Sequence, residues 1–143
     1  MPDQPILTAP IIGQTENALR ALLVRALHGS GLDYHQWVAL RVVSTSTPPL
    51  GQTQLRDRLQ DGLKIDSSMA DEVIDGLTTR GLLLVSADGV TVDDEGSTLY
   101  QRLDVEVRRI SAQVWTDIDC TDLAAAYQVC TVVTERANAL LAG

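Results

Sequence analysis

The stretch KIDSSMADEVIDGLTTRGLLL, Lys64–Leu84, decides the fold, because it holds a helix with both ends marked and a strand directly after it. Its apolar residues recur at the i, i+3, i+4 and i+7 spacing of one buried helical face: Ala70, Val73, Ile74 and Leu77. Asp66 can cap the start of this helix, and Gly81 can adopt the left-handed conformation that ends it. The residues that follow, 82–85, are short, apolar and β-branched at the end, which predicts a strand.

The neighbours of this stretch complete a recognisable unit. Before it, Leu55, Leu59 and Leu63 are spaced by four residues and predict a helix over 52–63. After it, an Asp-Gly step at 88–89 separates two β-prone runs, which is a strong hairpin signal. Two short helices joined tightly, the second sharply capped, form a helix-turn-helix. With the hairpin as a wing, the sequence predicts a winged helix-turn-helix.

Two more helices are predicted before this unit. Residues 1–10 hold three of the five prolines and little periodicity, so we expect an extended arm. A helix then runs from Ile11 to about His28, and Asp33 can cap another over 34–44. The first of these helices is apolar around most of its circumference, so it needs more than one packing partner.

Two further helices follow the wing. Acidic residues at 93–95 suit the start of a helix that runs to about Trp115, because carboxylates stabilise the positive end of the helix dipole. The last helix begins near Thr121 or Asp122 and is also apolar well beyond one stripe. A two-fold dimer joined by the first and last helices would bury this surplus apolar surface.

The charge distribution conflicts with a simple DNA-binding surface. The chain has a net charge of −8, which gives no general attraction to nucleic acid or anionic membranes. Between Leu50 and Tyr100, four basic and ten acidic residues give a net charge of −6. Three carboxylates, Asp71, Glu72 and Asp75, face outward on the helix where DNA phosphates would lie. By residue type alone, an ordinary solvated helix face is the commoner explanation for them.

Several other functions find no support in the residues. His28 and His35 have no recognised metal-ligand spacing, and Asp117, Asp119 and Asp122 lack the glycine and the distal Glu of a calcium loop, so we expect no metal and no cofactor. With no Ser/His/Asp order and no phosphate loop, the chain is not expected to be an enzyme.

The cysteines and the N-terminus indicate the compartment. Cys120 and Cys130 are ten residues apart in one predicted helix, which excludes an easy bridge, and we expect them to be buried as small hydrophobic residues. The N-terminus lacks a basic region, and no segment approaches about 20 uninterrupted apolar residues. We therefore expect a cytoplasmic protein without membrane contact. A single Lys against ten Arg points to a GC-rich bacterial source.

The order of these elements and several motifs resemble one family. GLDYHQWVALRVV at 31–43 resembles the second helix of the MarR (multiple antibiotic resistance regulator) family of bacterial transcription regulators. LKIDSSMADEVIDGLTTRGLL is similar to its reading helix, VDDEGSTLYQRL to its wing exit, and DCTDLAAAYQVCTVVTERANALL to its last helix. The resemblance implies a mainly α fold with a small β-hairpin wing, formed by a single MarR-like domain over 1–143. Residues 31–96 would form the winged helix-turn-helix lobe, and 11–30 and 97–143 the dimerisation helices.

The resemblance also implies partners and a site. A homodimer would place its two reading helices in successive major grooves of pseudo-palindromic duplex DNA, and a small, commonly aromatic ligand between the dimer helices and the lobe would release it. The residues that would contact DNA are Ser67, Ser68, Asp71 and Glu72 on the helix, with Arg56, Arg58 and Lys64 as phosphate contacts. Trp37 and Trp115 are candidates for the walls of the ligand pocket.

The wing departs from the family pattern. The family usually carries an Asp and an Arg there, whereas SADGVTVDD at 86–94 holds no Arg or Lys. Two functional hypotheses follow. The chain is a ligand-responsive regulator that binds DNA weakly or atypically, or it is a MarR-fold dimer that has lost DNA binding and acts as a protein-interaction or small-molecule-sensing module.

Overall fold

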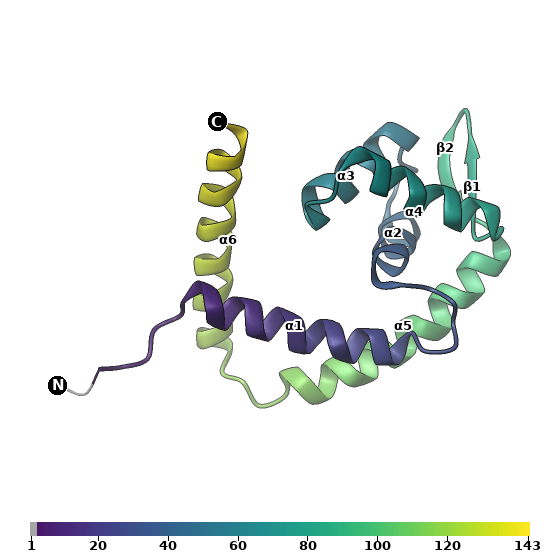
Figure 1. Cartoon of the computed structure of the whole chain (residues 1–143). Coiled ribbons are helices and arrows are strands. Elements are labelled where there is room, and N and C mark those ends of the chain that lie inside the picture. The colour runs from purple at the N-terminus through teal and green to yellow at the C-terminus, as the bar shows by residue number, and fades with distance from the viewer. Residues whose placement is uncertain (1–2) are drawn as a thin grey trace. The chain divides into compact units, whose positions relative to one another are not determined.

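Six helices and one β-hairpin make up residues 3–143, the part of the chain that this computed structural model describes. The chain divides into two compact units, one reaching to Arg108 and the other Arg109–Gly143. The elements (Figure 1) are α1 (Ala9–Ala26), α2 (Tyr34–Thr45), α3 (Gln52–Leu63), α4 (Ser67–Thr79), β1 (Leu83–Ser86), β2 (Gly89–Val92), α5 (Asp94–Trp115) and α6 (Cys120–Ala142). The predicted mainly α fold with a small hairpin is confirmed.

Helix α4 has the ends that the sequence predicts. The side chain of Asp66 accepts a hydrogen bond from the amide of Met69 at 2.8 Å, which satisfies one of the free amides of the first turn. At the other end, Gly81 has a φ of +74°, and the amide of Leu82 donates to the carbonyl of Leu77 at 3.0 Å. The four predicted core residues of this helix are all buried.

Helix α2 begins with a reciprocal cap. The carboxylate of Asp33 accepts from the amide of Gln36 at 2.8 Å, and the side chain of Gln36 accepts from the amide of Asp33 at 3.1 Å. This capping box satisfies two polar groups at once and fixes where the helix starts. Helix α3 covers the predicted residues 52–63 and is followed by Lys64 in the left-handed conformation, with φ at +54°.

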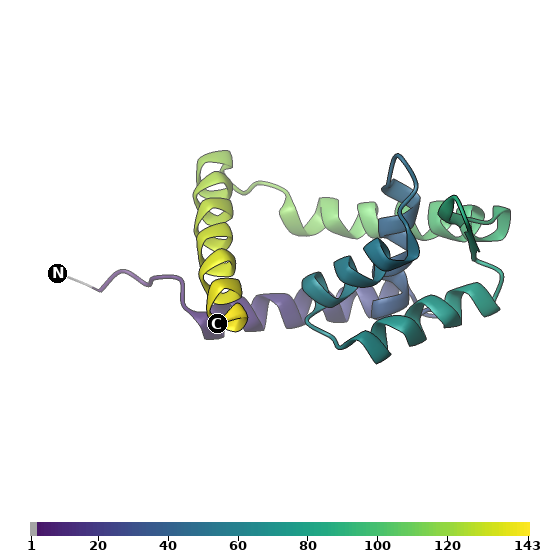
Figure 2. The ribbon, with the colours of Figure 1, turned by 90° about the horizontal axis from the view of Figure 1, so that it is seen from above.

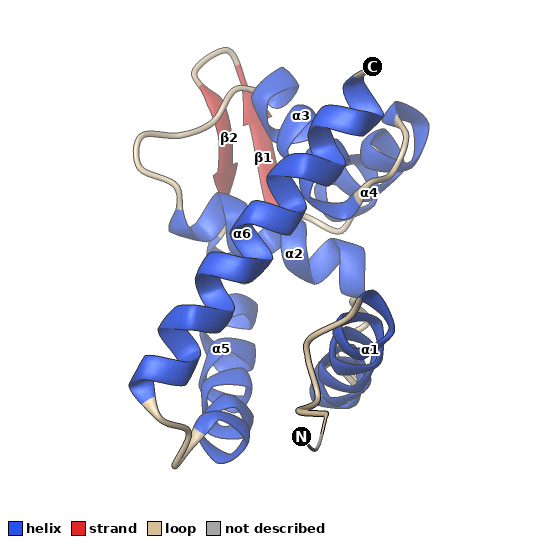
Figure 3. Ribbon diagram, turned by 90° about the vertical axis from the view of Figure 1, so that its left-hand side faces the viewer, coloured by secondary structure: helices blue, strands red, loops and turns tan. Residues whose placement is uncertain are grey.

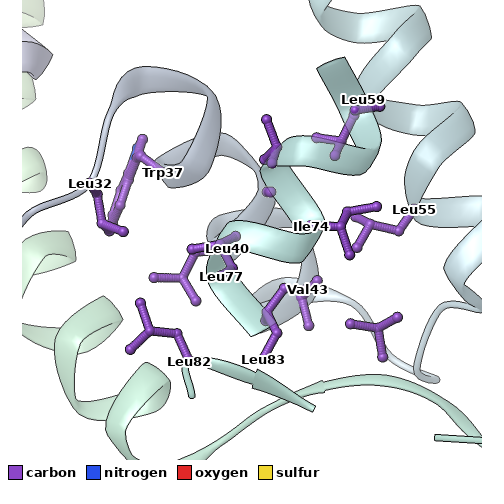
Figure 4. Close-up of a cluster of buried hydrophobic side chains, with 14 of the residues drawn as sticks. Leu32, Trp37, Leu40, Val43, Leu55, Leu59, Ile74, Leu77, Leu82 and Leu83 are labelled. Atoms are coloured by element: carbon purple, nitrogen blue, oxygen red, sulfur yellow. The ribbon is translucent and has the colours of Figure 1, made fainter. Parts of the chain in front are cut away.

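The core of the first unit forms where α2, α3, α4 and the hairpin meet. Figure 4 shows side chains from all of these elements in one cluster. Its most deeply buried members are Leu40, Leu55, Leu59, Ile74, Leu77, Leu83 and Val90. Because each helix contributes one apolar stripe to the same cluster, the helix-turn-helix and the wing form one packed lobe.

The hairpin is antiparallel and is held by a third segment. Its two strands lie side by side and are joined by a turn (Figure 3), and their register runs from the Leu83–Val92 pair to the Ser86–Gly89 pair. Leu50, just before α3, extends it, because its carbonyl accepts from the amide of Val90 at 2.7 Å. Gly89 has a φ of +126°, and a Cβ there would lie 2.7 Å from the carbonyl oxygen of Leu50. The glycine of the predicted hairpin signal is therefore required by both the turn and this close contact.

The start of α5 packs tightly against the wing. The amide of Asp93 donates to the carbonyl of Leu82 at 3.0 Å, and Gly96 is buried against the same carbonyl. A Cβ on Gly96 would overlap the carbonyl oxygen of Leu82. The hairpin and α5 can therefore pack this closely only because residue 96 is a glycine.

The structure differs from the sequence predictions at several points. Helix α1 begins at Ala9 instead of Ile11 and includes Pro10, because proline is tolerated in the first turn, where its missing amide has no partner to lose. In the second unit, α6 begins at Cys120, capped by the carboxylate of Asp119, which accepts from Thr121 at 2.7 Å.

The cysteine prediction is wrong. Cys120 and Cys130 are both free and exposed, and none of the residues of α6 is buried within the single chain. Trp115, at the end of α5, is 49% exposed in the single chain. Residue type indicates that a side chain favours burial but not which molecule buries it. Among residues 3–143, no helix is long and apolar enough to cross a membrane.

Candidate nucleic-acid interface

Helices α3 and α4 form the helix-turn-helix. They lie at an angle to each other, joined by the short turn at 64–66 (Figure 2). In this motif, the N-terminal residues of the second helix contact base edges, while the first helix lies across the backbone. Ser67 and Ser68 occupy the first two positions of α4, and both are exposed. The lobe therefore presents the start of α4 as a helix-turn-helix reader does.

The carboxylates of α4 differ in their surroundings. Glu72 and Asp75 are exposed, and neither has a hydrogen bond or ion pair with any described residue. Asp71 is only partly exposed, because it accepts a hydrogen bond from Nε of Arg56 on α3 at 2.8 Å. The side chain of Arg56 is 35% exposed and that of Asp71 45% exposed. Two predicted DNA-contact residues are thus brought together as an ion pair across the helix-turn-helix.

Two of the other cations in the lobe are also engaged. Nζ of Lys64 lies 3.1 Å from the carboxylate of Asp61 on the preceding turn. The guanidinium of Arg80 donates to the carbonyl of Gly31 at 3.0 Å and to that of Ser30 at 3.1 Å. These last contacts join the C-terminal end of α4 to the turn between α1 and α2.

Arg58 is the exception. Its side chain on α3 is exposed and makes no hydrogen bond or ion pair with residues 3–143. Of the four basic residues between Leu50 and Tyr100, Arg58 is therefore the one whose charge is not already directed at a partner in the described part of the chain. In the described lobe, the positive charge without a partner therefore lies on α3, and the wing carries no cation.

The wing surface is apolar and acidic. Leu84 is 50% exposed and Val85 40% exposed, and Asp88 lies at the exposed turn. Met69, near the start of α4, is 41% exposed. A wing of this composition offers phosphates no positive charge, as its sequence indicates.

The structural contacts of Arg80 were not foreseen from the sequence, which counted this residue only as one of four cations. Its hydrogen-bond partners precede it by 49 and 50 residues, and they are backbone carbonyls, which carry no residue signature. No local spacing rule could have identified this contact. The cap of α4 and the bond from Arg80 together fix the helix at both ends.

The two tryptophans have different surroundings. Trp37 is 3% exposed and stacks on Tyr100, with ring centroids 5.5 Å apart and planes at 23°. Trp115 belongs to the second unit and is half exposed. A depression of about 350 Å³ lies along the first turns of α5, and neither tryptophan lines it. Its lining residues are Asp94, Glu95, Thr98, Leu99 and Arg102.

Within the described residues, no group of three His, Cys, Asp or Glu side chains could hold a metal ion.

Solved structures match the chain in fold, whereas no protein-family model and no curated protein matches it. The transcriptional regulator PA3341 has a TM-score of 0.75 at 20% identity, over 90% of this chain and 96% of its own. CouR from Rhodococcus jostii RHA1, solved with p-coumaroyl-CoA, has a TM-score of 0.73 at 14% identity, over 87% and 89%. The MarR family protein Rv2887 of Mycobacterium tuberculosis, solved in complex with DNA, has a TM-score of 0.65 at 19% identity, over 92% and 98%.

The chain has the winged-helix fold of the MarR-family regulators, which confirms the resemblance inferred from its motifs. Its named neighbours include transcription regulators. Further structures of Rv2887 hold salicylic acid or p-aminosalicylic acid. At these low identities the likeness establishes the fold, and the chemistry must be argued from the residues of this chain.

Proposed function

We propose that this chain is a MarR-type transcription regulator of a bacterial cytoplasm, which acts as a homodimer and binds pseudo-palindromic duplex DNA through α4 with weak or atypical affinity. The observation that carries this proposal is the helix-turn-helix itself. The start of α4 is exposed and is capped by Asp66. The other face of α4 is buried in the core of the lobe. Such a helix is rigid and free on the side that a major groove would receive.

The residues at the start of α4 support contact with bases. Ser67, Ser68 and Glu72 project from the exposed side of the first two turns. Arg56, Arg58 and Lys64 lie on or just after α3, the helix that would cross the backbone. The neighbour Rv2887 has been solved with DNA, which supports the same use of the fold here.

The expected affinity is low because few cations face the DNA. A strongly salt-dependent binder makes roughly six to ten phosphate contacts. In this lobe Arg56 and Lys64 are each paired with a carboxylate, and the wing carries no cation. A dimer doubles whatever one lobe contributes, so two half-sites are needed for useful affinity.

The second unit supports the dimer. Helix α6 is 23 residues long and buries none of them within the single chain. Its exposed large apolar residues are Tyr127, Val129, Val132, Val133, Leu140 and Leu141. An apolar face of this extent is typical of a surface that a second subunit covers. We assign dimerisation to residues 11–30 and 97–143 of a single domain, as the resemblance implies.

We also propose that a small aromatic molecule controls DNA binding. Rv2887 has been solved with salicylic acid and with p-aminosalicylic acid, and CouR with p-coumaroyl-CoA, whose acyl group is aromatic; these structures support an aromatic ligand for this chain. Trp37 and Trp115 are the candidate reporters, and the chain has no other tryptophan. Titration with salicylate should change tryptophan fluorescence and release bound DNA. If neither signal changes with salicylate or with p-coumaroyl-CoA, control by these aromatic ligands is excluded.

Fluorescence anisotropy tests DNA binding. The full chain is titrated into labelled duplex from the intergenic region beside its own gene, at several salt concentrations, with an unrelated duplex of equal length as the control. We expect selective binding at about 50 mM salt that weakens steeply as salt rises, because each neutralised phosphate releases counterions. Absence of selective binding at about 50 mM salt would refute the proposal, since electrostatic affinity is greatest there.

A second candidate function is favoured by the charge of the lobe. Its net charge of −6 and the engagement of three of its four cations suit a MarR-fold dimer that has lost DNA binding and serves as a protein-interaction or small-molecule-sensing module. The same titration separates the two functions. A stable dimer that binds no duplex at low salt, yet responds to an aromatic ligand or a basic protein, supports this second function.

A further inference from the structure

We infer that Glu72 is the specificity-determining residue of α4, and that it selects a C·G base pair by accepting a hydrogen bond from the N4 amino group of cytosine. This inference rests on the proposed DNA-binding function and deepens it, because it names which base the reading helix prefers. It follows from what the exposed side chains of α4 can donate or accept.

The first step is the inventory of α4. Its sequence, SSMADEVIDGLTT, contains no Arg, Lys, Asn or Gln. The helix therefore cannot make the bidentate contacts that recognise guanine through Arg or Lys and adenine through Asn or Gln. Only hydroxyl groups and carboxylates remain. Serine and threonine hydroxyls both donate and accept, so they distinguish bases poorly.

The second step removes all but one carboxylate. Nε of Arg56 lies 2.8 Å from one carboxylate oxygen of Asp71, Oδ1, so this carboxylate is already paired with a cation and directed toward α3. Asp75 is the ninth residue of α4, more than two turns from the helix start that contacts base edges. Glu72 is the sixth residue, exposed, and has no partner in the part of the chain that the structure describes.

The third step is the chemistry of the groove. A carboxylate only accepts hydrogen bonds, so it needs an amino group, and the major groove offers the N6 amino group of adenine and the N4 amino group of cytosine. On adenine the amino group lies beside N7, another acceptor that repels a carboxylate. Cytosine presents the N4 amino group without a neighbouring acceptor on its own edge. Glu72 therefore favours cytosine.

Selection from a random duplex library tests this inference with the full chain and three variants. Glu72→Gln gives the side chain the donor and acceptor that pair with adenine, and Glu72→Ala removes the contact. Asp75→Asn is the matched control, because it removes one negative charge from the same exposed side of α4 without touching the proposed contact. Glu72 and Asp75 are both exposed, so the fold of all three variants should be retained.

We expect the unaltered chain to select one C·G pair in each half-site. Its preference over T·A should be about fivefold to tenfold, near the lower end of the discrimination that one good base contact provides. Glu72→Gln should move the preference at that pair to A·T, and Glu72→Ala should abolish it. Asp75→Asn should raise affinity for all sequences alike.

Each outcome decides one of the two proposals. If both Glu72 variants keep the base preferences of the unaltered chain, or change affinity only as Asp75→Asn does, Glu72 does not read a base, while DNA binding itself stands. If the unaltered chain enriches no duplex at about 50 mM salt, the proposed DNA-binding function fails and the inference fails with it.

Discussion

Arg56 on α3 and Asp71 on α4 form an ion pair across the helix-turn-helix, with Nε of the guanidinium 2.8 Å from the carboxylate. The pair joins Arg56, which is proposed to contact phosphate, to a residue on α4, the proposed reading helix. Since both side chains are partly exposed, the pair stabilises the fold by about 1 kcal/mol at most. Its main effect is on the charge that the lobe can present to DNA.

Substitution of Asp71 by Asn should strengthen DNA binding. The change frees the guanidinium of Arg56 and removes one negative charge, so we expect affinity to rise several-fold and the slope of log affinity against log salt to steepen by about one. Anisotropy titrations over a salt series measure both quantities. In a chain that already carries Arg56→Ala, Asp71→Asn should raise DNA affinity far less. A fall in affinity for Asp71→Asn would mean that Asp71 itself contacts DNA.

Substitution of Arg80 should lower the stability of the fold, whereas substitution of Arg58 should lower DNA affinity. Arg80→Ala removes two hydrogen bonds to the carbonyls of Ser30 and Gly31, and we expect a loss of about 1 to 2 kcal/mol in the free energy of unfolding. Arg80→Lys should restore little of it, because an ammonium group lacks the planar fork that reaches two carbonyls.

Arg58→Ala is the matched control for Arg80→Ala. It should change the stability by less than about 0.5 kcal/mol, because Arg58 has no partner within residues 3–143, yet it should lower DNA affinity and the salt slope. Urea unfolding and anisotropy of both variants provide the two measurements. Equal destabilisation by both substitutions would contradict the assigned roles.

Substitution of Gly96 by Ala should disrupt the junction between wing and α5. The added Cβ would overlap the carbonyl oxygen of Leu82, so the backbone must shift at a cost of about 3 kcal/mol. Gly62→Ala in α3 is the control, since nothing lies within 4 Å of its Cβ position. It should stabilise the chain by roughly 0.5 to 1 kcal/mol. Thermal unfolding of both variants should therefore shift in opposite directions, and parallel shifts would rule out the close contact at Gly96.

A charge on the apolar face of α6 should weaken the dimer. Tyr127 is 74% exposed in the single chain, and Tyr127→Glu would place a carboxylate in the proposed subunit interface. We expect light scattering at micromolar concentration to show a dimer for the unaltered chain and mainly monomer for this variant. Gln128→Glu adds the same charge at the neighbouring exposed position and should have a smaller effect. A monomeric unaltered chain would exclude the homodimer.

Much of the architecture could be predicted because it depends on interactions between close neighbours in the sequence. The caps by Asp33 and Asp66 act over three residues, and the apolar stripe of α4 repeats within two turns. Gly81 and Gly89 mark the end of α4 and the start of β2 through their own backbone conformations. The limits of α3 and the order of all the elements follow from signals of this short range.

The candidate site depended on contacts between distant residues. Fifteen residues separate Arg56 from Asp71, and Arg80 reaches carbonyls 49 and 50 positions before it. Sequence reasoning treated the charged residues of the lobe as independent of one another, and only their packing decided which charges are paired. The exposure of Cys130 in the single chain has the same origin, since packing decides whether the apolar residues of a helix are covered, and the residues of that helix alone do not.

The stretch from Lys64 to Leu84 by itself determined a capped helix followed by a strand, because hydrogen bonds and side-chain periodicity within it are local. The tertiary structure decided what that helix can present to a groove. The fold pairs the carboxylate of Asp71 with Arg56 and leaves that of Glu72 exposed and unpaired on the proposed reading surface, since an ion pair forms only where packing places two opposite charges within reach.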